Sequence, residues 1–408
     1  MRQNYVIILI TSLGLFLSAC SSMLEEPASF ESGSIDVEYS SSKINKEEAI
    51  HIANKILKKF DTRNDTPSTP SCEYIVNSHS TRSSSTPDTV AYVLNYPDNE
   101  GFAIISSSRK VHPVLAFSTI GKFDFDNEAV NLYFIDKIAS YIDNADDATI
   151  HEDEEELLAG CVVIDNYSPV NINQYYPWNK YVVQDFPNCP AGCVGVATAL
   201  CMGQTQDSLY YHKKMYYPKT IIENINNYSD SQSPIAKNKY LTAVDDMAKI
   251  IYWIGFDIDM IYKPEVSVAL SSKAYDLCKR LGFKLPSGYA DYNADENTLY
   301  DMAGYLYNDG IIYVHGDIPD AKNKAHAWVF DGCMYCYKDK ITKKGIQNVY
   351  FRCNWGWGGK NNGFYRADVF DSKNQIDNTD SDFTNTDYKV LNYFAVMQQS
   401  KYSIPILP

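Results

Sequence analysis

The sequence has no run of basic residues, and its acidic residues outnumber its basic ones. It contains 51 Asp and Glu against 36 Lys and Arg, which gives a formal net charge of −15 at pH 7. A surface field of that sign repels a phosphate backbone. The composition therefore argues against nucleic acid as a partner and against membrane binding through surface charge.

A complete zinc-site pattern is also lacking. Cys333 and Cys336 make one Cys-x-x-Cys pair, but no second pair follows at the right spacing, and Cys353 stands alone. We therefore expect no metal and no cofactor, and either a hairpin disulfide or two free thiols at the pair. An exported chain permits disulfides, but their connectivity does not follow from sequence.

The amino-terminal apolar run is too short to span a bilayer comfortably. Arg2 precedes nearly continuous apolar residues over 5–17, which predicts a signal peptide over 1–19. The run ends in Leu-Ser-Ala-Cys, similar to a lipoprotein lipobox with Cys20 as the lipid acceptor; a plain secretory signal is the alternative. Residues 20–44 are Ser-rich and predict a flexible tether. We expect an exported chain that is lipid-anchored at a bacterial outer membrane or cell surface.

Two globular regions follow, separated by an acidic stretch. Residues 45–150 carry the pattern of a small α+β domain. Residues 151–164 include five consecutive acidic residues and predict an exposed linker that proteases cut. Over 165–408 helical patterns come first and strand-rich segments follow from Ile311, which predicts an α+β domain with a cleft between two lobes.

The first domain has recognisable element signals. Asn45 and Glu48 make a capping-box-like helix start, and Pro-Asp-Asn-Glu-Gly at 97–101 marks a hairpin turn. The pattern predicts, in order, a helix from 45 to 60, a loop over 66–88, strands over 90–95, 102–106 and 111–117, and a helix over 131–142.

Four distant segments supply the groups that a thiol nucleophile needs, which are a base, a group that orients the base, and an oxyanion donor. Cys193 opens a helix of small residues, where the helix dipole lowers the pKa of a thiol. A buried structural cysteine is the alternative for Cys193 taken alone. Gln174 offers a side-chain N–H for the oxyanion, and Gln184 is the competing candidate.

Two histidines compete for the role of base. His326 lies on an alternating strand, and His315 lies on the preceding strand, so a hairpin brings both close together. Composition does not choose between them. Asn354, in the Asn-Trp-Gly-Trp-Gly-Gly segment at 354–359, supplies an oxygen for the Nδ1–H of a catalytic histidine, and Trp355 shields that hydrogen bond from water.

Together these segments resemble the streptopain family of papain-clan cysteine endopeptidases. The resemblance rests on Gln174 to Asn179, Gly192-Cys193-Val194, His326 to Gly332 and the 354–359 block, and residues 45–142 resemble the family's inhibitory propeptide. It implies a papain-like peptidase domain, with an N-terminal helical lobe and a C-terminal antiparallel sheet lobe, after a small α+β propeptide domain. It further implies Cys193 as nucleophile, His326 as base, Gln174 as oxyanion donor, and Asn354 and Trp355 as supports of His326.

We therefore expect a lipid-anchored zymogen of a cysteine endopeptidase that acts on proteins or peptides. Its own propeptide inhibits it until cleavage near the acidic linker. Ala325 stands where the family tends to have glycine, which leaves substrate preference open. The alternatives are an inactive surface relative that serves as adhesin or inhibitor, and a cell-wall peptide hydrolase, whose usual Asp-Cys-Ser-Gly nucleophile block is absent.

Overall fold

The computed structural model describes residues 42–60, 69–76, 88–145, 160–165, 170–229, 233–317, 325–371 and 390–397. The signal peptide, Cys20, most of the tether and most of the acidic linker lie outside these residues. Within the described ranges, no helix is both long enough and apolar enough to cross a membrane.

The first domain begins with α1 (Lys46–Phe60), as predicted. The Asn45 Oδ1 accepts a hydrogen bond from the Glu48 backbone N–H at 2.9 Å, which caps the helix. The apolar face of α1 is buried on the strands. The further elements are β1 (Ser71–Val76), β2 (Thr89–Asn95), η1 (Pro97–Asn99), β3 (Phe102–Ser106), β4 (Val114–Ser118), α2 (Glu128–Tyr133), η2 (Ile135–Lys137) and α3 (Ile138–Asp143).

Three boundaries in this domain differ from the prediction. Strand β1 lies inside the predicted loop. Its side chains show no strong alternation of buried and exposed positions, and its pairing with β2 makes it a strand. Strand β4 starts after Pro113, which has no N–H for a ladder hydrogen bond. The predicted 131–142 helix starts earlier, at the Asn127 cap, and is divided by η2.

Two predicted flexible segments end inside folded structure. Residues 42–44 of the predicted tether pack on the first domain, where Ile44 is buried and its N–H donates to the Ser107 carbonyl at 2.8 Å. The last residues of the predicted linker form β5 (Cys161–Ile164), which pairs with β10 (Ala325–Asp339). Both corrections depend on partners distant in sequence.

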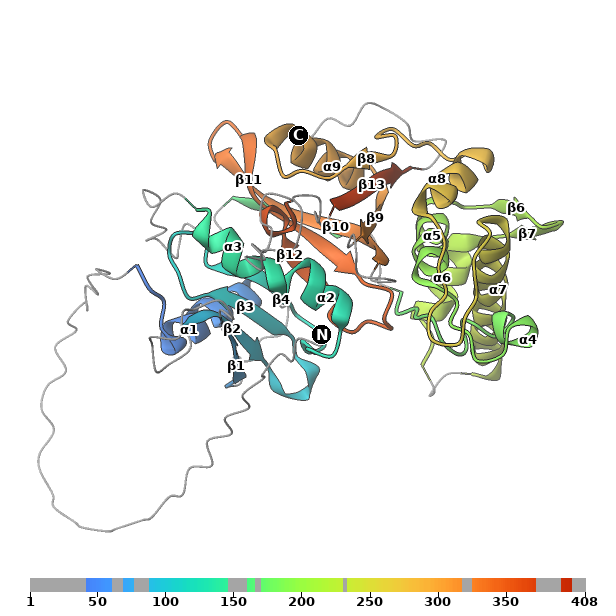
Figure 1. Ribbon diagram of the computed structural model, residues 1–408, viewed down its shortest axis with the longest axis horizontal. Coiled ribbons are helices and arrows are strands. Elements are labelled where there is room, and N and C mark those ends of the chain that lie inside the picture. The colour runs from blue at the N-terminus through green and yellow to red at the C-terminus, as the bar shows by residue number, and fades with distance from the viewer. Residues whose placement is uncertain are drawn as a thin grey trace, which may run out of the picture.

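The second domain has a helical lobe followed by a sheet lobe, which confirms the predicted two-lobed α+β class (Figure 1). The helical lobe contains α4 (Val182–Asp185), α5 (Cys193–Thr205), β6 (Leu209–Tyr211), β7 (Lys214–Tyr216), α6 (Pro218–Asn226), α7 (Pro234–Asp257) and α8 (Ser271–Arg280). The sheet lobe adds β8 (Ala290–Asp291), α9 (Glu296–Tyr307), β9 (Ile311–Asp317), β11 (Lys344–Asn354), β12 (Gly363–Arg366), η3 (Ala367–Phe370) and β13 (Val390–Val396) to β5 and β10.

Strands of the two domains join into one sheet. Among the described residues its order is β1-β2-β3-β4-β12-β11-β10-β9-β13-β8, with β5 added on β10. The junction is the antiparallel pairing of β4 with β12, in which Phe117 lies opposite Phe364. Helices α2 and α3 of the first domain run across this sheet (Figure 1). The first domain is therefore docked on the second by main-chain pairing as well as by side-chain packing.

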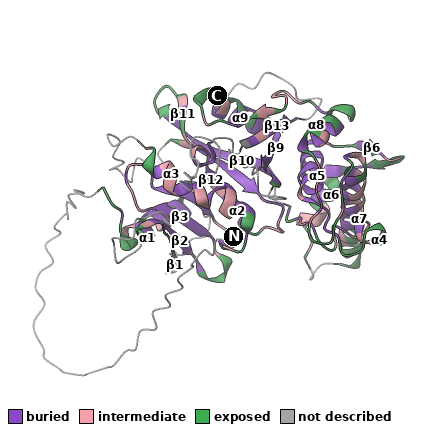
Figure 2. Cartoon of the chain, viewed as in Figure 1, coloured by how far each residue is buried: buried purple, intermediate pink, exposed green. Residues whose placement is uncertain are grey.

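Strand β10 separates two hydrophobic cores. Trp328 and Phe330 belong to a core shared with α2, whereas Ala327 and Val329 belong to a core shared with α5. This alternation is the period of a strand buried on both faces. Figure 2 shows β9, β10 and α5 as mostly buried.

Candidate active site

Cys193 is the first residue of α5, as predicted. Gly192 precedes it with φ +86°, and a Cβ at Gly192 would lie 2.7 Å from the Met260 Cε. The positive φ favours glycine here, because side chains with a Cβ rarely adopt that backbone angle. The Ser267 hydroxyl donates to the Pro190 carbonyl at 2.6 Å, so the chain near Met260 is fastened to the approach to the cysteine.

The electrostatics of the thiol are balanced between two effects. Burial raises the pKa of Cys193, whereas the backbone N–H groups of Ala327, Val194 and Cys193 itself act to lower it. Ala327 directly follows His326, so the start of α5 meets the start of β10 at the thiol. In this conformation burial prevails, and the thiol is held in its neutral form.

Gln174 lies beside the approach to Cys193. Its backbone carbonyl accepts a hydrogen bond from the Ala191 N–H at 2.7 Å, and its side chain is buried. Gln184, the competing candidate, is exposed on α4. The structure therefore brings Gln174, and not Gln184, next to the cysteine loop.

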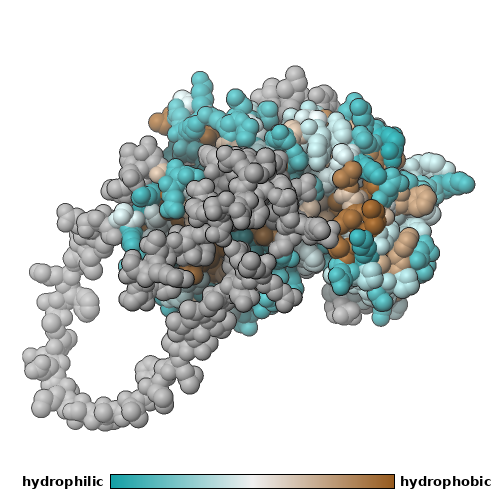
Figure 3. All heavy atoms as spheres, viewed as in Figure 1, coloured by the Kyte–Doolittle hydropathy of each residue, from teal (hydrophilic) through white to brown (hydrophobic). Residues whose placement is uncertain are grey.

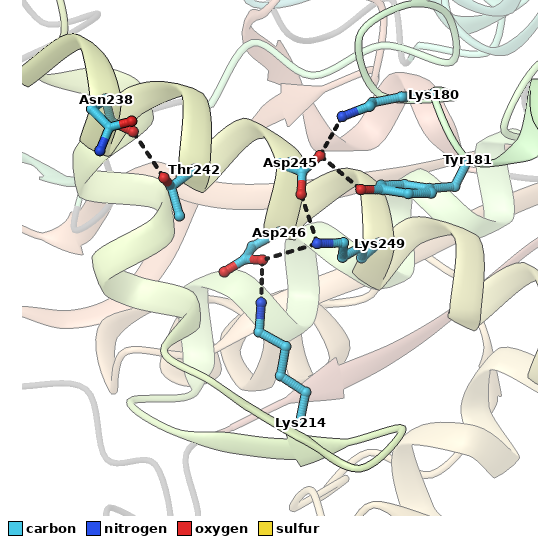
Figure 4. Close-up of polar contacts among 8 residues, drawn as sticks. All are labelled: Lys180, Tyr181, Lys214, Asn238, Thr242, Asp245, Asp246 and Lys249. Carbon is cyan, nitrogen blue, oxygen red and sulfur yellow. Dashed lines mark hydrogen bonds and ion pairs between the residues drawn. The ribbon is translucent and has the colours of Figure 1, made fainter.

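A polar network fastens the chain that follows Gln174 to α7 (Figure 4). The Lys180 Nζ and the Tyr181 hydroxyl donate to the Asp245 Oδ1 at 2.5 and 2.8 Å, and Lys249 donates to its Oδ2 at 2.7 Å. Burial alone would raise the pKa of Asp245, but these three donors outweigh it and lower the pKa below its ordinary range. The aspartate is ionised at neutral pH and holds the segment by charge-assisted bonds.

His326 is buried and turned toward the tryptophan segment. Its Nε2 lies 2.9 Å from the Trp355 carbonyl oxygen, and since a carbonyl only accepts, Nε2 carries the proton. The ring lies between Trp357 and Trp328, with centroids 5.6 and 6.0 Å away. Burial lowers the pKa of His326 to about 4, against the opposing effect of the Trp355 carbonyl. The nitrogen predicted to face the thiol is therefore engaged elsewhere, on a neutral ring.

The other predicted supports have different geometry. The Asn354 side chain donates to the Val170 carbonyl at 3.2 Å and accepts from the Gly356 N–H at 3.2 Å, so the predicted bond to the histidine Nδ1 is not made here. Trp355 contacts His326 through its main-chain carbonyl rather than by shielding alone. His315 pairs with Ala327 in the β9–β10 ladder, on the opposite face of the strand from His326.

A side chain of the first domain covers the histidine end of this ladder. The Tyr133 hydroxyl, on α2, donates to the Gly316 carbonyl at 2.5 Å, and its ring centroid lies 5.2 Å from that of Trp328. Gly316 is paired with His326. A Cβ at Gly316 would lie 2.2 Å from the Tyr133 ring, so glycine leaves the space that the tyrosine fills.

Cys333 and Cys336 form neither the expected hairpin disulfide nor the alternative pair of free thiols. Cys336 forms a disulfide with Cys161, and Cys333 is a free, buried thiol. The hairpin pairing of Cys333 with Cys336 is therefore wrong, because β5 places Cys161 directly opposite Cys336. Within the ranges that the structure describes, no group of three or more His, Cys, Asp or Glu residues is arranged to hold a metal ion.

Residues that the sequence interpretation did not assign also shape the site. Trp357 and Trp328 enclose the His326 ring. Arg352 donates through Nε to the buried Asp331 Oδ1 at 2.7 Å. The signal for Trp357 and Asp331 was present, since both lie within the segments that carry the resemblance, but their contacts are non-local and have no pattern in the sequence.

Comparison with known proteins gives two family matches along the chain. Residues 172–365 match the Peptidase C10 family, and residues 41–140 match the Spi protease inhibitor. The chain belongs to the streptopain family. Streptopain of Streptococcus pyogenes is 24% identical over 314 residues, which cover 68% of this chain and 74% of the relative. Streptopain of serotype M1 aligns with the same identity and coverage.

A fragment of prointerpain A from Prevotella intermedia aligns with a TM-score of 0.47 and 18% identity, covering 79% of this chain and 98% of that one. As a streptopain-family protein, the chain is a cysteine-type endopeptidase with a propeptide-like inhibitor domain. This confirms the predicted family, enzyme class and inhibitory domain.

Proposed function

We propose that the chain is an exported, lipid-anchored zymogen whose peptidase activity depends on Cys193 and His326. The observation that carries this proposal is the meeting of α5 and β10, where the Ala327 N–H points at the Cys193 thiol one residue after His326. Gln174 lies at the same loop through its bond to Ala191. A nucleophile, a base and an oxyanion donor are thereby drawn from three distant segments.

In the proposed mechanism, the unprotonated Nδ1 of His326 takes the thiol proton while Nε2–H stays bonded to the Trp355 carbonyl. The Cys193 thiolate then attacks the peptide carbonyl carbon, and the oxyanion is stabilised by the Gln174 side-chain N–H and the Cys193 backbone N–H. The imidazolium of His326 gives its proton to the leaving amine, which leaves an acyl-enzyme. Water that His326 deprotonates hydrolyses the thioester and regenerates the thiol. Asn354 and Trp355 hold the histidine segment.

Latency follows from the burial of the Cys193 and His326 side chains. Nε2 is protonated and bonded to Trp355, so Nδ1 is the nitrogen that can accept the thiol proton, but burial lowers the pKa of His326 to about 4 and raises the pKa of Cys193, which opposes that transfer. Tyr133 of the first domain packs on Trp328, the residue that stacks beside His326. Proteolysis at the acidic linker, followed by release of the first domain, uncovers this end of β10. The cut also separates the catalytic domain from an anchor at Cys20.

The substrate is a protein or a peptide. Figure 3 shows hydrophobic surface, in brown, over the helical lobe. The exposed hydrophobic residues of this lobe include Ile261 and Leu270, on the segment whose Met260 packs on Gly192. Apolar surface beside a nucleophile suits an apolar substrate side chain.

The test is cleavage of casein by the purified chain under reducing conditions, together with Cys193→Ala and the buried-thiol control Cys201→Ala. We expect the wild type and Cys201→Ala to process themselves and to cleave casein, whereas Cys193→Ala does neither. A wild type that is inactive in both assays contradicts peptidase function, and an active Cys193→Ala identifies another nucleophile. Metabolic labelling with a radioactive fatty acid, compared between wild type and Cys20→Ser, tests the anchor.

A further inference from the structure

A buried arginine joins the two catalytic strands to the segment that follows the linker. Arg352, on β11, donates through Nε to the Asp331 Oδ1 at 2.7 Å and through Nη2 to the Asp331 carbonyl at 3.3 Å. Its Nη1 forms an ion pair with the Asp165 Oδ1. One guanidinium thus lies between two aspartate side chains, and its fixed fork of N–H groups suits both contacts.

Asp331 is located at an irregularity of the β10–β11 ladder. The register shifts between Phe330 and Gly332, so Asp331 is the extra residue of a β-bulge, and Gly332 lies opposite Arg352. Arg352 bonds to both the side chain and the carbonyl of this extra residue. The arginine therefore fastens the bulge.

The bulge sets the register between His326 on β10 and the Asn354–Trp355 turn that follows β11. Beyond it, Val329 pairs with Asn354, and the next residue, Trp355, is the acceptor for His326. A one-residue slip in an antiparallel pair turns every side chain to the other face of the sheet. The position of His326 relative to the Asn354–Trp355 turn therefore depends on the arginine.

Asp165 enters this arrangement from a segment that is itself fixed to β10. Strand β5 pairs with residues 333–336, and the Cys161–Cys336 disulfide joins the two strands covalently. A Cβ at Gly332 would lie 2.7 Å from the Ile164 carbonyl oxygen, so the backbones also approach closely at the bulge. The Asp331 side chain is fully buried, whereas that of Asp165 is 49% exposed at the rim of the arginine.

We propose that Asp165 is a positioning residue for His326, acting through Arg352 and the Asp331 bulge, and that residues 161–165 are a working part of the catalytic domain. This inference rests on the proposed role of His326 as the base. It places productive cleavage before Cys161, since removal of Asp165 would leave one side of the arginine without its carboxylate. The segment touches no substrate group, so its effect appears in turnover rather than in substrate binding.

The electrostatics of Asp331, Arg352 and Asp165 agree with this assignment. Burial raises the pKa of Asp331 to about 8, against the opposing effect of a hydrogen bond with the Asn354 side chain. Burial also lowers the pKa of Arg352 to about 10, which still leaves it charged at neutral pH. The Asp165 carboxylate therefore supplies the negative charge that favours the guanidinium in this buried position.

The test uses the full chain, activated by proteolysis in the linker, with Asp165→Asn, Asp165→Glu and Glu296→Gln as matched variants. Glu296 is an exposed carboxylate that pairs with Lys338 of β10 at 2.7 Å, so it controls for loss of a surface ion pair on the same strand. Turnover of a peptide substrate is expressed per active site, titrated as the thiol that iodoacetamide labels at Cys193. This normalisation removes any loss of folded protein from the comparison.

We expect Asp165→Asn to lower kcat by about tenfold with KM unchanged, as a displaced catalytic group does. Asp165→Glu restores most of that loss, and Glu296→Gln behaves as wild type. An Asp165→Asn variant with wild-type kcat per titrated site overturns the inference, and so does an equal loss in Glu296→Gln. If Cys193→Ala retains activity, the proposed function itself has failed. The Asp165 variants alone cannot give that result, so the two failures are distinguishable.

Discussion

The proposed nucleophile, Cys193, and the proposed base, His326, are held in different ways. Cys193 is placed by its own helix, whose start needs Gly192 and a few contacts from Met260 and Ala327. His326 is placed by the β10–β11 bulge, by the tryptophan segment and by Tyr133 of the first domain. Changes outside the site therefore act on the histidine, and we propose that the propeptide controls the peptidase from that side.

The largest expected effect is a loss of stability when Arg352, on the histidine side of the site, is replaced. Arg352→Met leaves Asp331 buried without its donor, and we expect a loss of about 4 kcal/mol in the free energy of unfolding. Because burial raises the pKa of Asp331 to about 8, the carboxyl takes a proton in the variant, which moderates the loss. Urea unfolding of the intact chain measures it. A loss below about 1 kcal/mol would show that the arginine does not hold the bulge.

The second effect concerns the tyrosine that covers the histidine. Tyr133→Ala removes a buried aromatic ring and its bond to Gly316, and we expect self-processing to accelerate on the order of thirtyfold, equivalent to about 2 kcal/mol of lost docking energy. The rate of conversion followed by gel electrophoresis gives the answer. Tyr74→Ala, at an exposed tyrosine of β1, is the control and should convert at the wild-type rate.

The third effect is a pH dependence of the intact chain. The pKa of His326 is lowered to about 4 when folded, against 6.5 when unfolded, so the unfolded state binds more protons between these values. Stability contributed by the neutral ring is fully present above pH 6.5 and is lost as the pH falls toward 4. We expect a loss of about 2 kcal/mol at pH 5. The free energy of unfolding of His326→Gln, measured over the same pH range, should lack this part of the dependence on pH. An unchanged dependence would mean that His326 is protonated in the folded chain.

The smallest effect is expected on the cysteine side. Lys180→Ala removes one of three donors to Asp245, while Lys249 and Tyr181 remain. Exposed ion pairs contribute little, so kcat/KM of the processed enzyme should stay within about twofold of wild type. A large loss would mean that the Gln174 segment depends on this one bond, and that the two sides of the site are held alike.

Sequence predicted what is determined locally. The Asn45 cap, the α1 face and the start of α5 at Cys193 follow from residues within one or two turns. The β2–β3 hairpin follows from its turn and its flanking apolar runs. The resemblance supplied the family, and the order of the four segments placed Cys193, Gln174 and His326 in one region.

The rest depends on contacts between distant segments. Strand β5 and the Cys161–Cys336 bond require β10, and nothing in the sequence around Cys161 specifies that pairing. The orientation of His326 toward the Trp355 carbonyl depends on packing that includes α2 of another domain. The hydrogen bond expected between Asn354 and the histidine is the clearest case, because the residues are neighbours in space but their side chains have other partners.

The most direct test of this account is the rate at which iodoacetamide alkylates Cys193, measured against pH before and after processing, with the modified residue identified by peptide mass. Alkylation follows the thiolate. We predict slow labelling of the intact chain that rises only in the alkaline range, and fast labelling of the processed chain that persists into mildly acidic pH, where the imidazolium of His326 stabilises the thiolate. Identical profiles for the two forms would contradict the claim that the propeptide controls the histidine.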